Sequence, residues 1–350
     1  MTRRLAEVAK YVGVSEATVS RVLNGKPGIS EATRTAVLTA LDVLGYERPT
    51  KLRGERARLV GLVLPELQNP IFPAFAEVVA GTLARRGFTP VLCTRTGAGV
   101  SEADYVDMLL DQHVSGVIFA GGNYAQAAAE HEHYLRLRER NLPVVLVNAG
   151  IDDLGFACVA TDDAHAVDQA YKHLVSLGHT SIGLILGPGD HVPSARKQAA
   201  FEALAGDADG LVERTIFSME GGQSAATRLV RHGITGIVCA SDILAIGAMR
   251  AVRRLGLAVP ADVSVVGFDD SALMNCTDPP LTTIRQPIDA MGQAAVALLA
   301  NQVAGHPVPT EGMLFEPELV VRGSTGPVRT RDAGERRKGR QARVPARTHA

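Results

Sequence analysis

A short stretch near the start of the chain surrounds one arginine with small polar side chains. Residues 14–25 read VSEATVSRVLNG, and the arginine is Arg21. Its guanidinium can donate two hydrogen bonds to O6 and N7 of guanine, a contact that discriminates this base by ~1–3 kcal/mol. The hydroxyls of Ser15, Thr18 and Ser20 suit phosphate oxygens, and such contacts set the register of a protein on DNA. The stretch therefore favours DNA contact, and the alternative is an ordinary polar face of a small helical bundle.

Three short helices within residues 1–46 are expected to position these side chains. An apolar i, i+3, i+4, i+7 stripe begins at Leu5, and Gly13 breaks the first helix. Ser15 can cap a second helix, and Ser30 can cap a third. Helix, turn and capped helix form a helix-turn-helix, in which the N-terminal residues of the second helix face base edges in the major groove.

The charge distribution supports a DNA-contacting head on a body of another kind. The formal net charge of the whole chain is only −1. Residues 1–58 hold 11 Lys/Arg and 6 Asp/Glu, residues 59–321 hold 16 and 29, and residues 322–350 hold 9 and 2. A basic head on an acidic body is expected of a chain that touches nucleic acid with one part only.

The body is expected to have an α/β fold with doubly wound parallel sheets. From residue 59, apolar β-branched runs such as LVGLVLPE at 59–66 and VSGVIFAGG at 114–122 alternate with helix-length segments. A second series begins with TSIGLILGP at 180–188, and two series predict two lobes. Ligand sites in such sheets lie at the carboxyl ends of the strands, which here face the cleft between the lobes.

The chain therefore divides into four expected regions. They are a helix-turn-helix DNA-binding headpiece at 1–46, a hinge or linker at 47–58, a two-lobed effector-binding and dimerisation domain at 59–324 and a basic, disordered tail at 325–350.

The cellular compartment is predicted from signals that do not occur in the sequence. No apolar leader opens the chain and no run of 18 apolar residues occurs, so a cytoplasmic protein without a membrane span is expected. The four cysteines, Cys93, Cys158, Cys239 and Cys276, are too far apart in sequence to form a zinc pair. They are expected to be reduced and buried.

Enzyme signals are also weak. Nucleotide-loop, nucleophile-elbow and metalloprotease motifs do not occur in the sequence, so neither an enzyme nor a cofactor is expected. HEH at 131–133 is interpreted as part of a solvated helical face and not as a metal site. The aspartate pairs 152–153, 162–163 and 269–270 are adjacent in sequence, so the two side chains of each pair are expected to diverge and not to form an acid–base dyad.

Longer stretches resemble the LacI/GalR family of bacterial regulators. The resemblance begins with LAEVAKYVGVSEATVSRVLNG and runs in order to about residue 324 through LQNPIFP, LVSLGHTSIGLILGP, ASDILAIGAMRA, VPADVSVVGFDD and PPLTTIRQP. Within the family, the chain looks most like actinomycete regulators of maltose or maltodextrin genes. The resemblance implies a helix-turn-helix headpiece followed by a two-lobed effector domain like that of periplasmic binding proteins.

The resemblance implies roles for headpiece residues. Glu16 and Ala17 occupy the first positions of the recognition helix, and Arg21 matches the arginine that reaches a base. Glu16 can accept a hydrogen bond from a cytosine amino group or face solvent. Backbone-contacting or capping positions are matched by Ser15, Thr18, Ser20 and Asn24. Arg4 replaces a hydroxyl residue, which implies an ionic phosphate contact.

The linker departs from the family pattern. Tyr46 matches the aromatic residue that closes the headpiece. The family's hinge helix wedges a leucine into the minor groove, and the single leucine here, Leu52, comes earlier in a shorter segment. Gly54 weakens a helix at this place by ~1 kcal/mol relative to alanine. Leu52 is the expected wedge, although the hinge is the part of the family mechanism that this sequence supports least.

The family also implies an effector pocket. The implied pocket residues are Asn69, Ile71, Phe72, Phe75, Asn148, Arg196, Lys197, Phe217, Ser241, Asp269 and Ile288. Arg196 and Lys197 compete for one ligand-clamping position, and the sequence leaves this choice open. Phe72 and Phe75 have the alternative of helix core, and Asp269 that of a turn cap. A carboxylate, amides and a cation around an aromatic face suit a hydroxyl-rich ligand.

The resulting prediction is a homodimeric transcriptional regulator that binds a palindromic operator. Family precedent favours a repressor that a sugar releases from DNA, with maltose or a maltodextrin as the leading ligand. The alternatives are a nucleobase or other non-sugar effector, a corepressor, a sugar-binding receptor without DNA function, and a sugar-converting enzyme.

Overall fold

The computed structural model describes residues 2–23, 26, 28–44, 58–95, 99–150, 154–206 and 211–328. The chain forms two compact units, Met1–Leu59 with Gly87–Thr89, and Val60–Arg86 with Pro90–Ala350. We call the helices of the first unit the headpiece and the second unit the core domain, and each is described by itself.

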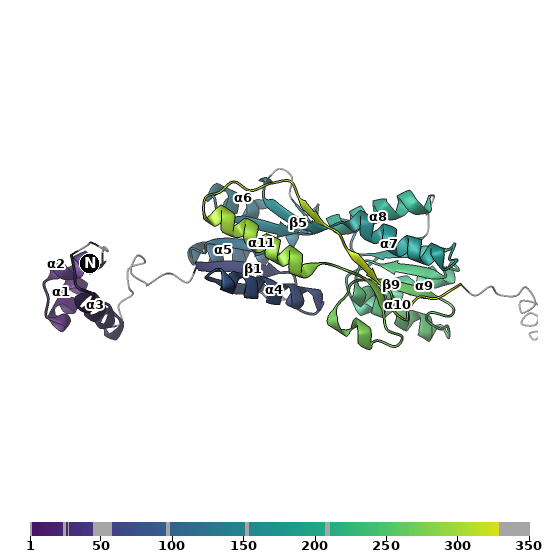
Figure 1. Cartoon of the computed structure of the whole chain (residues 1–350), viewed down its shortest axis with the longest axis horizontal. Coiled ribbons are helices and arrows are strands. Elements are labelled where there is room, and N and C mark those ends of the chain that lie inside the picture. Colours follow the sequence, from purple (N-terminus) through teal and green to yellow (C-terminus); the bar gives the residue numbers. More distant parts are fainter. Residues whose placement is uncertain are drawn as a thin grey trace, which may run out of the picture. The chain divides into compact units, whose positions relative to one another are not determined.

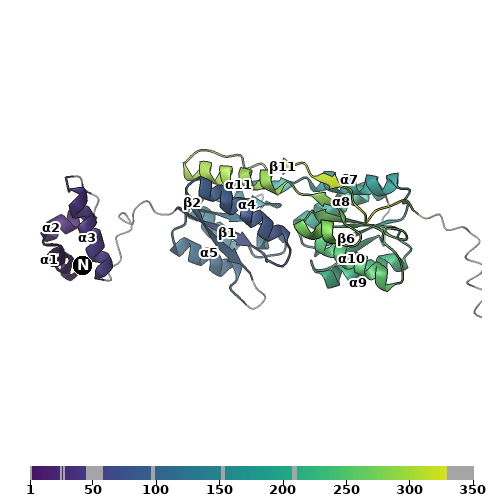
Figure 2. The ribbon, with the colours of Figure 1, turned by 60° about the horizontal axis from the view of Figure 1, so that its bottom comes forward.

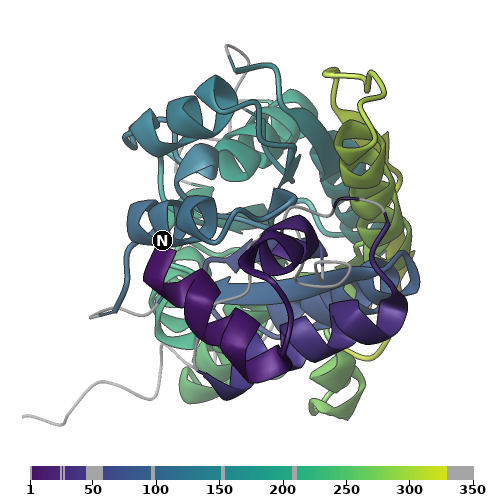
Figure 3. The ribbon, with the colours of Figure 1, turned by 90° about the vertical axis from the view of Figure 1, so that its left-hand side faces the viewer.

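The headpiece consists of α1 (Thr2–Val12), α2 (Glu16–Leu23) and α3 (Glu31–Val43), the purple ribbons that follow the N-terminus in Figure 3. The turn between α1 and α2 places Gly13 at φ +73°, a conformation that costs glycine little. A small apolar core holds the three helices together; it contains Val8, Ala9, Val19, Val22, Val37, Ala40 and Leu41. This arrangement is the helix-turn-helix that the sequence predicts.

The first lobe of the core domain contains a six-stranded sheet in the order β11-β5-β4-β3-β1-β2. Its strands are β1 (Arg58–Leu64), β2 (Phe88–Thr94), β3 (Gly116–Phe119), β4 (Val144–Val147), β5 (Ala157–Thr161) and β11 (Met313–Phe315). The central pairs are parallel, for example Leu62 with Ile118. Helices α4 (Ile71–Arg85) and α11 (Ile288–Val303) cover one face, and α5 (Glu102–Asp111) covers the other (Figure 2). Helix α6 (Glu132–Glu139) packs beside α5.

The second lobe repeats this plan, with the order β12-β10-β9-β8-β6-β7. Its strands are β6 (Ile182–Leu186), β7 (Val212–Arg214), β8 (Gly236–Cys239), β9 (Ser264–Asp269), β10 (Thr282–Arg285) and β12 (Glu318–Val320). Helices α7 (Asp163–Ser176) and α8 (Val192–Ala205) lie on one face, and α9 (Met219–Arg231) and α10 (Asp242–Arg254) on the other (Figure 2). Short 3-10 helices are η1 (Asn123–Ala125) and η3 (Ala272–Cys276).

The chain passes between the lobes after β5, between β10 and α11, and between β11 and β12 (Figure 1). Apart from the antiparallel pair of β10 with β12, the described pairings are parallel. The α/β class with two doubly wound parallel sheets, expected from the alternating apolar runs, is therefore confirmed. Strands β5, β10, β11 and β12 were not among the strands that the sequence pattern predicts.

The first residues of the expected tail are ordered, contrary to the prediction. Thr325 Oγ1 lies 2.9 Å from Nε2 of His173, and the Val328 amide donates a hydrogen bond of 3.0 Å to the carbonyl of Leu177. A side-chain bond to α7 and a backbone bond to Leu177, the residue that follows α7, therefore hold residues 325–328 against the second lobe. The rest of the predicted tail, 329–350, lies outside the described residues.

Two further expectations need correction. His133 of the HEH sequence is buried, and its Nε2 lies 3.0 Å from Oε1 of buried Glu102, so this histidine is not part of a solvated face, whereas Glu132 is exposed. Cys93, Cys158 and Cys239 are buried free thiols, but Cys276 is exposed because it ends η3 on the surface. Within the described ranges, no cluster of three or more His, Cys, Asp or Glu side chains is arranged to hold a metal ion. None of the helices in these ranges has the length and apolar character needed to cross a bilayer.

Candidate functional site

The exposed face of α2 carries the predicted DNA-contacting residues. Ser15, Glu16, Ala17 and Arg21 are exposed, whereas the intervening Val19 and Val22 are buried in the headpiece core. Ser20 is half-buried. The helix therefore separates an apolar inner face from a polar outer face, as required of a helix that enters a groove.

The N-terminal end of α2 is held by its cap. Ser15 Oγ accepts a hydrogen bond of 3.1 Å from the amide of Thr18 and lies 2.9 Å from Thr18 Oγ1. Capping fixes where the helix begins and therefore where Glu16 and Ala17 are presented. Ser30 caps α3 in the same way, with a bond of 3.1 Å from the Thr33 amide. The side chain of Arg4 and residues Asn24, Tyr46 and Leu52 lie outside the described residues, so their predicted DNA contacts stay predictions.

A cavity of about 220 Å³ lies between the two lobes of the core domain. It is lined from both sheets at the carboxyl ends of β3, β4, β8 and β9, where ligands bind in doubly wound folds. Ten of the predicted pocket residues line it: Asn69, Ile71, Phe72, Phe75, Asn148, Lys197, Phe217, Ser241, Asp269 and Ile288. The structure thus brings together residues that are up to 219 positions apart.

The adjacent residues Arg196 and Lys197 have different surroundings in the structure. Arg196 is exposed and does not line the cavity; its Nη1 donates to the carbonyl of Asn148, at 3.3 Å, across the cleft. Lys197 is buried, forms an ion pair with buried Asp163 and places Nζ 4.0 Å from the ring centroid of Phe268. Of the two candidates, Lys197 alone lines the cavity as a cation.

Asp269 supplies a buried carboxylate. Its Oδ1 accepts a hydrogen bond of 2.7 Å from Gln286, and its Oδ2 has no hydrogen-bond partner among the described residues. Burial and the nearby carboxylate of Asp242 raise the pKa of Asp269 well above its usual range. A ligand hydroxyl that donated to Oδ2 would satisfy this oxygen.

Strained backbone marks the same strand ends. Asn148, after β4, has φ +68°, and Asp269, the last residue of β9, has φ +118°. Non-glycine residues in this region cost of order 1–3 kcal/mol each and cluster at ligand-binding sites. The amide of Asn148 is also bound, since Nδ2 donates to Gln286 Oε1 at 3.3 Å and Oδ1 accepts from the Thr161 amide at 3.1 Å.

A neutral histidine borders an aromatic wall. His191 Nδ1 lies 2.9 Å from Ser194 Oγ, and its ring meets that of Phe217 edge-on at 5.2 Å between centroids. Burial, helped by the charges of Lys197 and Arg214, lowers the pKa of His191 to about 4. Its imidazole is therefore uncharged at neutral pH and can both donate and accept a hydrogen bond.

Sequence reasoning missed several polar lining residues: Glu66, Arg95, Gln126, Asp163, His191 and Gln286. Asp163 and Gln286 follow β5 and β10 within two residues, so the rule that placed Asn148 at a strand end could have found them had these strands been predicted. Arg95 donates to Asn123 Oδ1 at 2.8 Å, and burial raises the pKa of Glu66.

A helix-turn-helix unit joined in one chain to a two-lobed domain with an inter-lobe cavity defines the class of ligand-responsive transcriptional regulators. Residues 4–49 match the family model described as "Bacterial regulatory proteins, lacI family", and residues 171–325 match that of the "Periplasmic binding protein-like domain". The chain is 52% identical over 335 residues to the HTH-type transcriptional regulator reg1 of Streptomyces lividans, covering 93% of this chain and 97% of that protein. The chain belongs to the LacI family and is a DNA-binding transcriptional regulator.

Other relatives agree. The HTH-type transcriptional regulator MalR of Streptomyces coelicolor is 52% identical over 334 residues, which cover 93% of this chain and 97% of that protein. The transcriptional regulator CelR–cellobiose complex superposes with a TM-score of 0.69 at 30% identity, covering 91% of this chain and 99% of that one. The lac repressor dimer bound to operator and the anti-inducer ONPF superposes with a TM-score of 0.69 at 29% identity, covering 91% of this chain and 98% of that one.

Proposed function

We propose that this chain is a homodimeric, non-enzymatic repressor that acts in the cytoplasm. Two headpieces bind the half-sites of a palindromic operator, and a sugar bound between the lobes releases the DNA. Maltose or a maltodextrin is the leading ligand.

The ligand class rests on one observation: a buried carboxylate with an unpartnered oxygen, Asp269 Oδ2, lies in a cavity that is also lined by aromatic rings and amides. Sugars present hydroxyl groups to such acceptors and C–H faces to aromatic rings. Phe72 and Phe217 supply rings, while Asn69 and Asn148 supply amides that can donate and accept. Related regulators solved in complex with cellobiose and with lactose support the same class.

The cavity also limits size. At about 220 Å³ it is smaller than the roughly 300–1,000 Å³ of most small-molecule pockets. A short sugar fits this arrangement of the lobes better than a long one, and a longer maltodextrin requires the lobes to move apart. Ligand length is therefore an informative variable.

DNA release follows from the ligand's unequal affinity for two arrangements of the lobes. Asp269 belongs to the second lobe and Asn148 to the first, so a ligand that touches both favours one inter-lobe angle. The resulting shift in DNA affinity can be no larger than this difference in ligand affinity. Release by ligand corresponds to preferential binding to the arrangement that does not bind DNA.

The test is binding of the full-length chain to palindromic DNA from upstream of its own gene, measured by fluorescence anisotropy at one salt concentration. Maltose, maltotriose and longer maltodextrins are titrated into the complex. Loss of anisotropy with one of them supports the proposal and identifies the sugar, whereas tighter DNA binding would make that sugar a corepressor. If none of them changes binding, maltose is rejected and other sugars and nucleobases are titrated next.

The Asp269→Asn variant provides a matched control. It retains the shape of the side chain and replaces one carboxyl oxygen with an amide NH2 group, so we expect normal DNA binding and a weakened response to ligand. A normal ligand response in this variant would reject Asp269 as the hydroxyl-binding group.

A further inference from the structure

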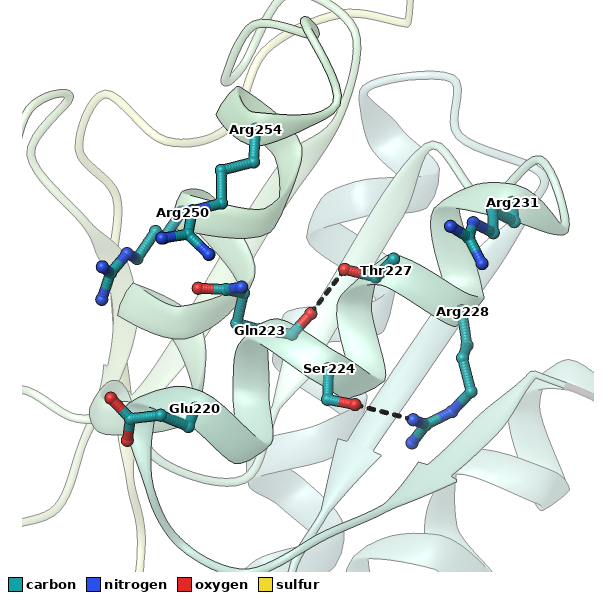
Figure 4. A pocket seen from close by; sticks show the side chains of 8 residues that line it. All are labelled: Glu220, Gln223, Ser224, Thr227, Arg228, Arg231, Arg250 and Arg254. Carbon is teal, nitrogen blue, oxygen red and sulfur yellow. Dashed lines mark hydrogen bonds between the residues drawn. The ribbon is translucent and has the colours of Figure 1, made fainter.

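A second hollow lies on the surface of the second lobe, outside the inter-lobe cavity. It has a volume of about 560 Å³, is largely open to solvent and runs along α9, with the last turns of α10 as its other wall. Figure 4 shows Arg250 and Arg254 on the α10 side and Arg228 and Arg231 on α9. We call these residues, with the polar side chains between them, the arginine groove.

The groove is charged because few carboxylates face it. Glu220 is the one acidic residue in its lining. Arg228 is held in place by Glu213 at 2.7 Å and by Ser224 Oγ at 2.9 Å. Within the part of the chain that the structure describes, Arg231, Arg250 and Arg254 form no salt bridge. Arg250 Nη1 donates to Met219 Sδ at 3.6 Å, and a thioether sulfur is a weak acceptor. One guanidinium is thus held by a carboxylate, and the other three have no carboxylate partner among the described residues.

Polar groups complete the floor. Gln223 and Thr227 lie between the two arginine pairs, and Thr227 Oγ1 donates to the Gln223 carbonyl at 2.7 Å (Figure 4). The side-chain amide of Gln223 remains able to donate and accept. Planar guanidinium groups and an amide around a hollow form the donor set that binds phosphate oxygens by paired hydrogen bonds.

The charge of the groove selects for a multivalent anion. Arg228, Arg231 and Arg254 lie in the last turns of their helices, where each helix end carries about half a negative charge. These ends, Glu220 and the carboxylate of Glu213, which is paired with Arg228, leave the four guanidinium groups with an excess of about one positive charge. A monovalent anion gains little from an exposed site of this kind, but several linked phosphates can engage both walls together.

We propose that the arginine groove binds a small molecule with two or more linked phosphate groups, at a site separate from the sugar cavity. Its volume falls within the range of small-molecule pockets. A DNA backbone requires a wider basic surface, whereas residues 59–321 hold 29 Asp/Glu against 16 Lys/Arg.

The test uses inorganic tripolyphosphate, titrated into the full-length chain by isothermal titration calorimetry, with sulfate as the monomeric comparison. We expect tripolyphosphate to bind at least about tenfold more tightly than sulfate and to weaken when salt rises from about 50 to 200 mM. The Arg231→Gln/Arg250→Gln double variant removes one cation from each wall. It should lower the affinity for tripolyphosphate at least about tenfold. The melting temperature should not change, because both side chains are exposed.

Arg253→Gln is the matched control. This residue lies on α10 between the two groove arginines, is exposed, and faces Asp278 at 3.8 Å instead of the groove. We expect tripolyphosphate affinity within about twofold of the unmodified chain, since distant exposed charges are screened.

Four outcomes would overturn the proposal. One is no detectable binding of tripolyphosphate. Another is binding that the double variant leaves unchanged, which would assign it to the basic ends of the chain. The third is equal weakening by Arg253→Gln and the double variant, which would indicate general attraction without a site. If the double variant instead loses affinity for a short non-operator duplex while tripolyphosphate is unaffected, the groove contacts nucleic acid and the small-molecule assignment is wrong.

Discussion

The side-chain amide of Gln286 donates a hydrogen bond of 2.7 Å to Oδ1 of Asp269. The other end of this amide accepts a bond of 2.8 Å from Thr161 Oγ1. Gln286 lies between β10 and α11, where the chain returns from the second lobe to the first. One buried side chain therefore connects the proposed ligand-binding carboxylate with a strand end of the opposite lobe.

Replacing Gln286 should affect both stability and ligand response. Gln286→Leu leaves Asp269 Oδ1 and Thr161 Oγ1 without this partner, and unpaired buried groups cost ~1–3 kcal/mol each. We expect a lower melting temperature and weaker sugar binding, measured by calorimetry. Thr161→Val removes one of these bonds and leaves the bond between Gln286 and Asp269 in place. Its losses of melting temperature and of sugar affinity should therefore be smaller. Equal losses in the two variants would contradict the link through Asp269.

The exposed arginine of α2 gives a prediction about DNA. Arg21→Ala should lower the ratio of operator to non-specific affinity by ~1–3 kcal/mol, the value of one bidentate base contact. Lys10 is an exposed cation on α1. Lys10→Ala should weaken binding to the operator and to a non-specific duplex by the same factor, because a phosphate contact carries no sequence information. Electrophoretic mobility shifts at fixed salt measure both ratios. An unchanged ratio for Arg21→Ala would reject its assignment to base recognition.

Much of the fold could be predicted because its signals are local. Helix caps such as Ser15 and continuous apolar strands such as β4 can be recognised from a few consecutive residues. β5 and β10 carry small or polar residues, ACVAT and TTIR, whose burial depends on their neighbours in the sheet. For this reason Asp163 and Gln286, which follow these strands, were missed as cavity residues.

The choice between Arg196 and Lys197 could not come from sequence, since adjacent helix positions differ only by about 100° of rotation. Packing decides it: α8 turns Lys197 toward Asp163 and leaves Arg196 exposed. Family patterns had likewise marked Asp269 for its chemistry, but its free Oδ2 and its bond to Gln286 required the tertiary structure.

The buried ion pair predicts a stability effect. Lys197→Met should destabilise the core domain by ~3–5 kcal/mol because it leaves the carboxylate of Asp163 buried without its cation. Adding Asp163→Asn should restore a large part of this loss. Arg196→Ala should change stability by no more than ~0.5 kcal/mol, as expected of an exposed side chain. Urea unfolding measures all three, and additive losses in the double variant would contradict the pairing.

Two helical glycines should respond oppositely to an added methyl group, because Gly247 lies at the close contact between α9 and α10 and Gly81 of α4 has space around it. A Cβ on Gly247 would lie 2.1 Å from the carbonyl oxygen of Met219, so Gly247→Ala should destabilise by ~1–3 kcal/mol through overpacking. Gly81, within α4, has its nearest atom at 3.6 Å, the side-chain Nη1 of Arg85, and Gly81→Ala should stabilise by ~0.4–1 kcal/mol. Thermal unfolding tests both signs, and a stabilised Gly247→Ala would show that the helices can separate without cost.

His191 and Asp242 should contribute to the pH dependence of stability with opposite signs. Burial lowers the pKa of His191 from 6.5 to about 4, so between these values the unfolded chain binds a proton that the folded chain does not. The contribution of His191 to the free energy of unfolding is therefore present above pH 6.5 and is lost as pH falls toward 4.

Asp242 should act in the opposite direction. Burial raises the pKa of Asp242 from 3.8 to about 6, so its contribution to the free energy of unfolding is present at low pH and is lost as pH rises through 6. Relative to His191→Gln, the unmodified chain should lose on the order of 2 kcal/mol between pH 7 and 4.5; relative to Asp242→Asn, it should gain stability over the same interval. Urea unfolding at both pH values measures the two differences. Equal signs for the two variants would mean that one of the two pKa values is shifted in the opposite direction, and no difference for a variant would mean that its side chain titrates alike in the folded and unfolded chains.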